Sequence, residues 1–241
     1  MMGDLPGHIF PGLAFLAWAG VWAFALLRRG GNAVANPWET HADPVLAADA
    51  VATAAWESWA KIVIPLLEMA GELRWVTWPM TEASSTIFAH ITADKVVIIS
   101  GIADRLTARR VLPPQSDRLA LALAFFVPAV LFSTHGQHGP VAAVAHELFA
   151  KCLFAAGALV LIEQLRPAPL LRWCRIYSVA LAGAWFIHTG WMLYVSGYDL
   201  MSDALAPRTY LFFTWYAVAT AALLIATLSL ARRAPASQNT A

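Results

Sequence analysis

The amino-acid sequence predicts an all-α fold, a polytopic membrane protein built as a bundle of seven transmembrane helices. The chain has 241 residues, of which 59% are hydrophobic and only 13% are charged, and its mean hydropathy is +0.60. One soluble core cannot hide that much apolar surface. Apolar stretches of about 20 residues, the length that crosses a bilayer, occur at roughly 10–28, 50–72, 86–105, 118–134, 141–164, 173–195 and 209–231.

The arginines indicate how these spans are oriented. Eleven of them fall at one set of span ends, and only Arg74 and Arg208 fall at the other. In membrane proteins the cytoplasmic loops carry the excess of basic residues. We therefore expect the N-terminus outside, the C-terminus in the cytoplasm, and the protein in the plasma (inner) membrane. Nothing marks a second domain, so we expect one transmembrane domain at 1–233 and a disordered cytoplasmic tail at 234–241.

Charge and cysteine content narrow the possible partners. The formal net charge is +1 and no long basic run occurs, so nucleic acid is not an expected partner. The two cysteines, Cys152 and Cys174, lie inside apolar stretches, which favours neither a disulfide framework nor a cysteine metal cluster. The expected partners are the lipid bilayer and a lipid or small-molecule substrate, and the oligomeric state stays open.

Histidines gather toward the outer ends of the predicted spans. His135 and His138 lie on a turn before Pro140, which suits the first position of the next helix. His146 would then lie about 9 Å along that helix, below the membrane surface. Other spans bring further histidines to the same depth in the membrane. The candidate metal ligands are therefore His8, His90, His135, His138, His146 and His188.

Carboxylates share helix faces with these histidines and with lysines. Glu72 ends the second span, and Asp94 lies four residues after His90, on the same helix face. Because a charge facing lipid at mid-bilayer costs about 3 kcal/mol, charged side chains within the spans should turn inward and pair. This expectation applies to Glu57, Lys61, Asp94, Lys95, Glu147 and Lys151, with Glu57–Lys61 and Glu147–Lys151 at pairing distance along their helices.

Several functions are compatible with this pattern. Imidazoles and carboxylates at one membrane level are ligands for zinc, copper or iron, so the first hypothesis is a transition-metal site near the outer face. Glu72 and Asp94 are its candidate catalytic groups, as ligand or general base for chemistry on a lipid or small substrate. The alternatives are a proton- or ion-coupled transporter that uses the stripe of buried Glu, Lys and Asp side chains, haem held by two histidines, and a purely structural membrane protein.

Five segments of the chain resemble the bacterial type of the transmembrane protein 45 family, also called domain of unknown function 716. They are GHIFPGLAFLAWAGVW, WESWAKIVIPLLEMAGE, FAHITADKVVIISGIADRL, THGQHG followed by VAHEL, and AWFIHTGWMLY. The resemblance implies a membrane protein of seven spans and carries no settled activity. It also implies that motif positions of the family are occupied by His8, Glu57, Glu72, His90, Asp104, His146 and one of His135 and His138.

The chain departs from the family at two positions that matter for a ligand set. Relatives often have glutamine where His188 stands, and they have a histidine in the last span where this chain has Trp215 and Tyr216. Either a ligand has moved between spans, or neither position is a ligand.

Overall fold

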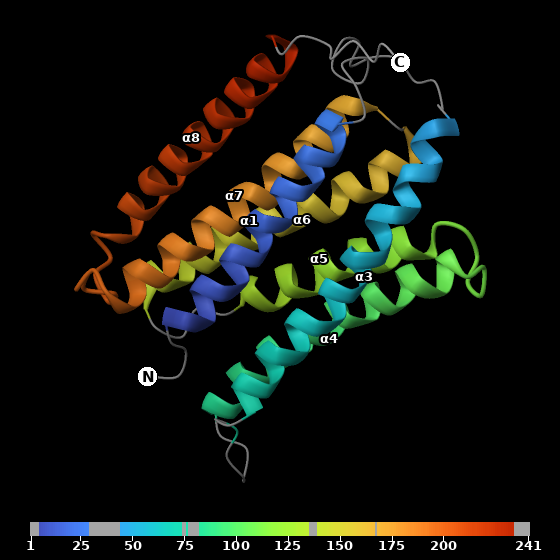
Figure 1. Ribbon diagram of the computed structural model, residues 1–241. Coiled ribbons are helices and arrows are strands. Elements are labelled where there is room, and N and C mark those ends of the chain that lie inside the picture. Colours follow the sequence, from blue (N-terminus) through green and yellow to red (C-terminus); the bar gives the residue numbers. More distant parts are fainter. Residues whose placement is uncertain are drawn as a thin grey trace.

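The computed structural model describes residues 5–28, 44–73, 76, 82–134, 139–166 and 168–233, and all regular secondary structure in these residues is α-helical. The helices are α1 (Leu5–Arg28), α3 (Pro44–Leu73), α4 (Glu82–Ala108), α5 (Ser116–Ser133), α6 (Pro140–Leu165), α7 (Pro169–Tyr194) and α8 (Ala206–Arg233) (Figure 1). The seven described helices confirm the predicted all-α class. The predicted tail at 234–241 lies outside the described residues.

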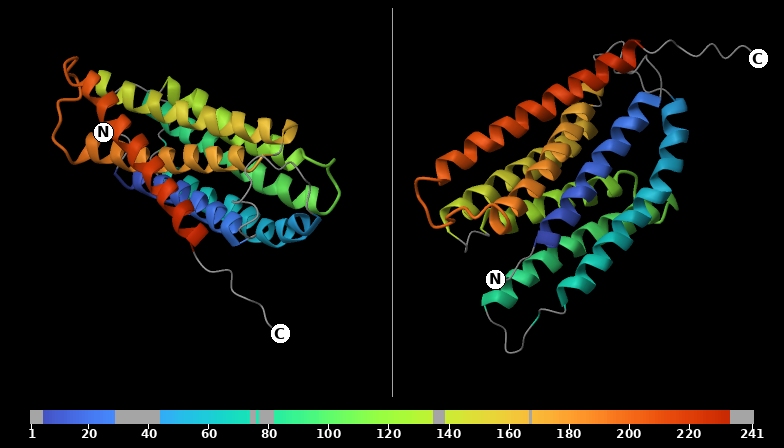
Figure 2. Two further views of the ribbon diagram at one scale, coloured as in Figure 1. Left: turned by 90° about the horizontal axis from the view of Figure 1, so that it is seen from above. Right: turned by 60° about the vertical axis from the view of Figure 1, so that its left-hand side comes forward.

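Packing between the helices follows a curved row. Neighbours in this row pack in the order α3, α4, α5, α6, α7, α1. Helix α8 packs mainly against α6 and α7, and less closely than the other neighbours pack. In the right-hand view of Figure 2, α8 lies along one edge of the bundle. Of the described side chains of α8, only Thr209 is buried, and this helix packs against the outside of the core through partly buried side chains such as Phe213 and Leu224.

The core lies where α1, α5, α6 and α7 meet. Phe125, Phe149 and Trp185 are each no more than 2% exposed and belong to one apolar cluster. Phe149 and Phe186 stack with ring centroids 4.2 Å apart, and the indole N–H of Trp185 donates to the carbonyl of Ala145 at 2.9 Å. These contacts fix α6 against α7, because buried aromatic rings combine a large apolar area with directional polar contacts.

Five of the described helices, α1, α5, α6, α7 and α8, are long and apolar enough to cross a membrane. The other two, α3 with 30 residues and α4 with 27, carry more charged residues, and at 1.5 Å per residue both exceed the ~30 Å hydrocarbon thickness. Several of these charges, including those of Lys61 and Asp104, face the neighbouring helix, as described below. Part of α3 is nonetheless exposed and apolar, including Val63, Ile64 and Leu67.

Close contact between α3 and α4 depends on a glycine. A Cβ atom at Gly101 would lie 2.6 Å from the carbonyl oxygen of Ser58 and 2.9 Å from the Cβ of Lys61. Only a residue without a side chain fits there, since real Cβ contacts are longer. The two backbones therefore approach at the level of Lys61, and this brings the charged side chains of the two helices into contact.

Candidate functional site

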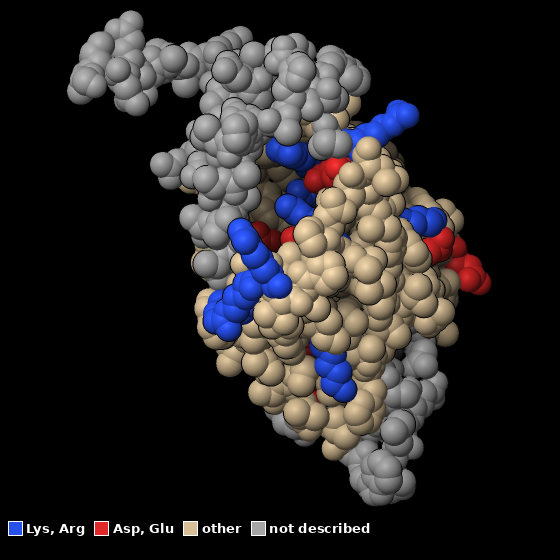
Figure 3. All heavy atoms as spheres, turned by 90° about the vertical axis from the view of Figure 1, so that its right-hand side faces the viewer, with Lys and Arg blue, Asp and Glu red and all other residues tan. Residues whose placement is uncertain are grey.

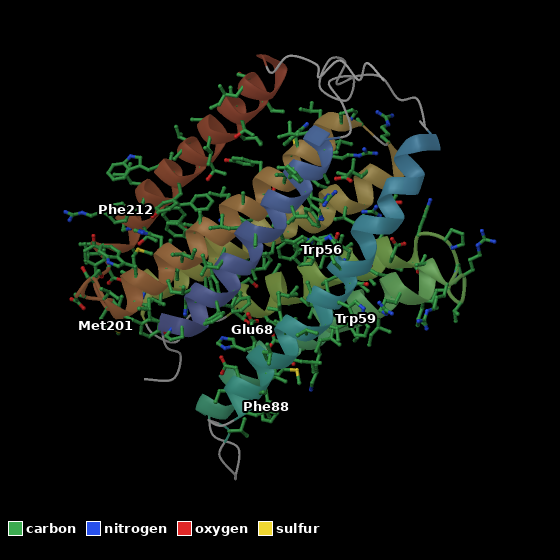
Figure 4. All side chains as sticks on the ribbon, viewed as in Figure 1. Trp56, Trp59, Glu68, Phe88, Met201 and Phe212 are labelled. Atoms are coloured by element: carbon green, nitrogen blue, oxygen red, sulfur yellow. The ribbon has the colours of Figure 1, made fainter. Side chains whose placement is uncertain are left out.

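The seam between the antiparallel helices α3 and α4 collects titratable side chains in three layers. Each layer joins a residue of α3 to a residue of α4. From one end to the other the layers are Lys61 with Asp104, Glu68 with Asp94, and Glu72 with His90. Figure 4 labels Glu68, in the middle layer, on α3. We call this set of residues the α3–α4 seam.

Lys61 occupies the first layer as a buried cation between two carboxylates. Its ammonium group lies 2.8 Å from Asp104 Oδ2 and 3.3 Å from Glu57 Oε1, and its side chain is only 4% exposed. The predicted Glu57–Lys61 pair is thus confirmed as inward-facing. Asp104, which sequence reasoning singled out only through the family resemblance, makes the shorter contact.

Glu57 also connects this layer to α1, at the other end of the row of helices. The indole N–H of Trp18 donates to Glu57 Oε1 at 2.9 Å, and that of Trp22 donates to Oε2 at 3.3 Å. The ammonium of Lys61 lies 5.2 Å from the Trp18 ring centroid. Trp18 and Trp22 are four residues apart and share one face of α1, so both can reach one carboxylate on another helix.

The middle layer pairs two carboxyl groups. The side chains of Glu68 and Asp94 are within hydrogen-bonding reach of each other. One oxygen of each, Glu68 Oε1 and Asp94 Oδ2, is buried without a hydrogen-bond donor from the described residues. A hydrogen bond between two carboxyl groups requires a proton on one of them, because an ionised carboxylate only accepts.

Ser100 lies between the first and middle layers. Its side chain is 0% exposed, and its hydroxyl oxygen has no hydrogen-bond partner among the described residues. Along α4 it is about 9 Å from Asp94 and about 6 Å from Asp104, at 1.5 Å per residue. The interval between the two charged layers therefore contains a polar group.

The last layer lies at the end of the seam and is partly exposed. His90 Nδ1 lies 3.3 Å from Glu72 Oε1, with side-chain exposures of 18% and 23%. Glu72 thus supports an imidazole, whereas Asp94 contacts Glu68 in the middle layer. The two residues that sequence reasoning named as catalytic candidates are on the same seam, in neighbouring layers.

Two of the predicted histidine ligands meet beside this end of the seam. The rings of His8 and His146 have centroids 5.8 Å apart, and both side chains are buried, at 4% and 2% exposure. Phe132 separates them from His90, since its ring centroid is 5.7 Å from that of His90 and 6.1 Å from that of His146. His8 and His146 are therefore ring neighbours, and His90 is one aromatic ring away. The predicted cluster of histidines at one metal site is not supported by the described residues.

The other predicted ligands are not brought to this place. His188 faces α8, where the Tyr216 hydroxyl lies 3.2 Å from its Nδ1, and its ring also contacts Trp191 and Phe212. His135 and His138 lie outside the described residues. Within the described ranges, no three His, Cys, Asp or Glu side chains are close enough together to hold a metal ion.

Three of the side chains that were predicted to face inward are exposed instead. Glu147 and Lys151 do pair, with 2.7 Å between Lys151 Nζ and Glu147 Oε1, but their side chains are 44% and 59% exposed. Lys95 is exposed as well. The expectation that these residues turn inward was wrong. For the pair on α6, the core-facing side of the helix is occupied by apolar residues such as Leu148 and Phe149.

A second buried ion pair was not anticipated from the sequence. Arg175 Nε donates to Glu163 Oε1 at 2.7 Å, Arg175 is 7% exposed, and its guanidinium carbon lies 4.0 Å from the Trp22 ring centroid. The sequence suggested only that Arg175 marks a cytoplasmic span end.

In the space-filling view, acidic and basic side chains lie next to one another in a recess, whereas most of the described surface around it is uncharged (Figure 3).

The segment that matches a known protein family comprises the helices α5, α6 and α7. Residues 114–201 match a family of unknown function, DUF716. This match supports the family resemblance over these residues, which contain the motifs THGQHG followed by VAHEL and AWFIHTGWMLY. The DUF716 segment contains His146, His188 and the Glu163–Arg175 pair, whereas the α3–α4 seam precedes it in the chain. The family description assigns no activity, so the function must be inferred from the geometry.

Proposed function

We propose that this chain is a membrane transporter that conducts protons along the α3–α4 seam, with its N-terminus outside and its C-terminus in the cytoplasm. The observation that carries the proposal is the middle layer, where Glu68 and Asp94 face each other with a buried oxygen on each that lacks a donor. Two carboxyl groups in contact exchange one proton without moving the backbone. Buried ionisable groups within membrane helices are costly and commonly mark proton relays.

The order of the layers supports a route rather than a single binding site. A proton entering at the partly exposed pair of His90 and Glu72 would next meet the Glu68–Asp94 pair. Ser100 lies beyond it, followed by Asp104, which is bound to Lys61. The intervals of about 6–9 Å along α4 exceed a direct hydrogen bond, so each needs one or more bridging waters.

Proton flux in proteoliposomes tests this function. Vesicles loaded with potassium and a pH-sensitive dye are given valinomycin, and the resulting inside-negative potential drives protons inward. We expect the wild-type protein to acidify the vesicles faster than protein-free membranes do. The double variant Glu68→Gln/Asp94→Asn should lose this flux, whereas the matched control Asp199→Asn, at an exposed loop position, should retain it. A wild-type rate equal to that of protein-free vesicles would contradict the proposal.

A transition-metal site is the second candidate, and one observation favours it. The 5.8 Å between the ring centroids of His8 and His146 suits two imidazoles bound to one ion at about 2.0–2.1 Å from each nitrogen. His146 Nδ1 lies 2.8 Å from the carbonyl oxygen of Ala142. If Nδ1 carries the proton and donates a hydrogen bond to that carbonyl, the lone pair of the ring is on Nε2. This is the tautomer in which a histidine usually binds a metal.

In this second reading the ion is zinc, copper or iron, and His135 or His138 would complete the ligand set. Glu72 would be the general base for a reaction on a lipid or small substrate, and haem is the alternative occupant. Elemental analysis and a visible spectrum of the purified protein test the reading. Metal should be lost in His8→Ala and His146→Ala and retained in His188→Ala, because His188 faces α8. Metal-free wild-type protein after expression with added metal would exclude this candidate.

A further inference from the structure

The outer surface of α6 carries an ion pair near the middle of a membrane-spanning helix. Glu147 and Lys151 are 2.7 Å apart, and their side chains are 44% and 59% exposed. Lys151 is the twelfth of the 26 residues of α6, so it lies about 16 Å from one helix end and about 21 Å from the other. In a bilayer, this surface faces the hydrocarbon of the lipids.

Such a position is unfavourable unless something covers the charges. A lysine side chain can extend toward the membrane surface, but its reach of about 6 Å is shorter than the distance to either helix end. The helix cannot rotate to bury the pair, because its opposite face holds Ala145, Phe149 and Leu153 in the core. Within the described chain, the neighbouring helix α8 leaves the pair exposed.

Charge complementarity favours a second copy of the same chain as the cover. The surface carries one negative and one positive group side by side, so a two-fold axis beside α6 brings four charges of alternating sign together. Self-complementarity of this kind is what a two-fold interface requires. An anionic lipid headgroup would suit Lys151 but would place a second negative charge beside Glu147.

The neighbouring positions permit close helix contact. Ala143 precedes Glu147 by four residues and Ala155 follows Lys151 by four, so all four residues form one stripe along α6. Small residues at such spacing allow transmembrane helices to approach each other. We propose that two copies of this chain pack α6 against α6 along the stripe of Ala143, Glu147, Lys151 and Ala155, with Glu147 of each copy bound to Lys151 of the other.

Cysteine cross-linking in native membranes tests the contact. Ala155→Cys is introduced into a chain in which Cys152 and Cys174 are replaced by alanine, and an oxidant is added. We expect a disulfide-linked dimer. The matched control is Leu123→Cys on α5, at a position that is 47% exposed and outside the stripe, and it should remain monomeric. Absence of a dimer at position 155, or equal cross-linking at position 123, would overturn the proposal.

A second measurement avoids the cysteine-free background. The mass of the detergent-solubilised wild-type protein, measured by light scattering over a concentration series, should show a dimer. Lys151→Glu places like charges together and should weaken association about tenfold, and the charge-swapped variant Glu147→Lys/Lys151→Glu should restore it. A monomeric wild type, with or without bound lipid or another protein, would contradict the proposal, as would unchanged association of Lys151→Glu.

Discussion

Lys61 shows how a buried charge is tolerated in this protein. Its ammonium group contacts Asp104 and Glu57, and Glu57 also accepts from the indoles of Trp18 and Trp22. Each charged group therefore has a partner, which is the condition under which a buried ion pair is stable. The partners are unequal, however. If Lys61 is removed, Glu57 keeps two donors, whereas Asp104 loses the ammonium group that is its closest partner.

We expect Lys61→Met to lower the free energy of unfolding by about 3–5 kcal/mol, because the change leaves Asp104 buried without its cation. Adding Asp104→Asn should recover part of this loss, so the double variant should be more stable than Lys61→Met alone. Thermal unfolding in detergent measures both effects. Lys95→Met is the control, since Lys95 is exposed. If Lys61→Met behaved like Lys95→Met, the buried network would not contribute to stability.

Helical spacing in the sequence identified the residues of this network only in part. It found Glu57 with Lys61 and Glu147 with Lys151, because residues four apart on a helix are neighbours whatever the helix packs against. Spacing could not determine which pair is buried, and the Glu147–Lys151 pair proved to be exposed. The partners from other helices, Asp104 and Trp18, depend on helix packing. The six histidines were likewise predicted to share a membrane level, but the rotation of α7 directs His188 toward α8.

The helices α3 and α4 are the elements on which the proposed proton route depends. Hydropathy located both from the sequence, although the helices begin at Pro44 and Glu82, several residues before the apolar stretches at 50 and 86. The difference arises because backbone hydrogen bonds continue through the polar residues that precede each stretch. The pairing of the two helices depends on Gly101, whose role only the packing reveals.

Gly101→Ala should destabilise the protein by about 1–3 kcal/mol, the usual cost of overpacking, because the added methyl group would lie 2.6 Å from the Ser58 carbonyl oxygen. It should also reduce proton flux, since α3 and α4 must separate to accommodate it. Gly71→Ala, on α3, is the control, because nothing lies within 4 Å of a Cβ atom there. Equal stability and flux in the two variants would show that the close approach at Gly101 is unimportant.

In the whole molecule, Glu57 closes the row of helices into a ring by joining α3 to Trp18 and Trp22 on α1. The start of α1 and the end of α8 lie at opposite ends of the bundle (Figure 1), which agrees with an odd number of crossings. Composition alone predicted the membrane class, because no soluble fold could bury so much apolar surface. Composition could not predict ring closure, which depends on side-chain contacts between distant segments.

The arginine distribution leads to a prediction about topology. Eleven arginines fall at one set of span ends, and the C-terminal end of α8 belongs to this set. A fluorescent protein fused to the C-terminus should therefore lie in the cytoplasm and fluoresce. A reporter that works only outside, such as an alkaline phosphatase, should be active when fused before α1 behind a suitable export signal. Phosphatase activity from the C-terminal fusion would reverse the orientation and place the His90–Glu72 layer at the cytoplasmic side.

The proton proposed to lie between Glu68 and Asp94 can be observed by infrared spectroscopy of the purified protein. A protonated carboxyl group absorbs in a carbonyl-stretch band that carboxylates and amides do not share, and it shifts in heavy water. At neutral pH we expect this band in the wild-type protein and its loss in both Glu68→Gln and Asp94→Asn, because the amide then donates the hydrogen bond to the remaining carboxylate. A wild-type spectrum without the band, or a band unchanged in the double variant, would contradict a shared proton at the centre of the α3–α4 seam.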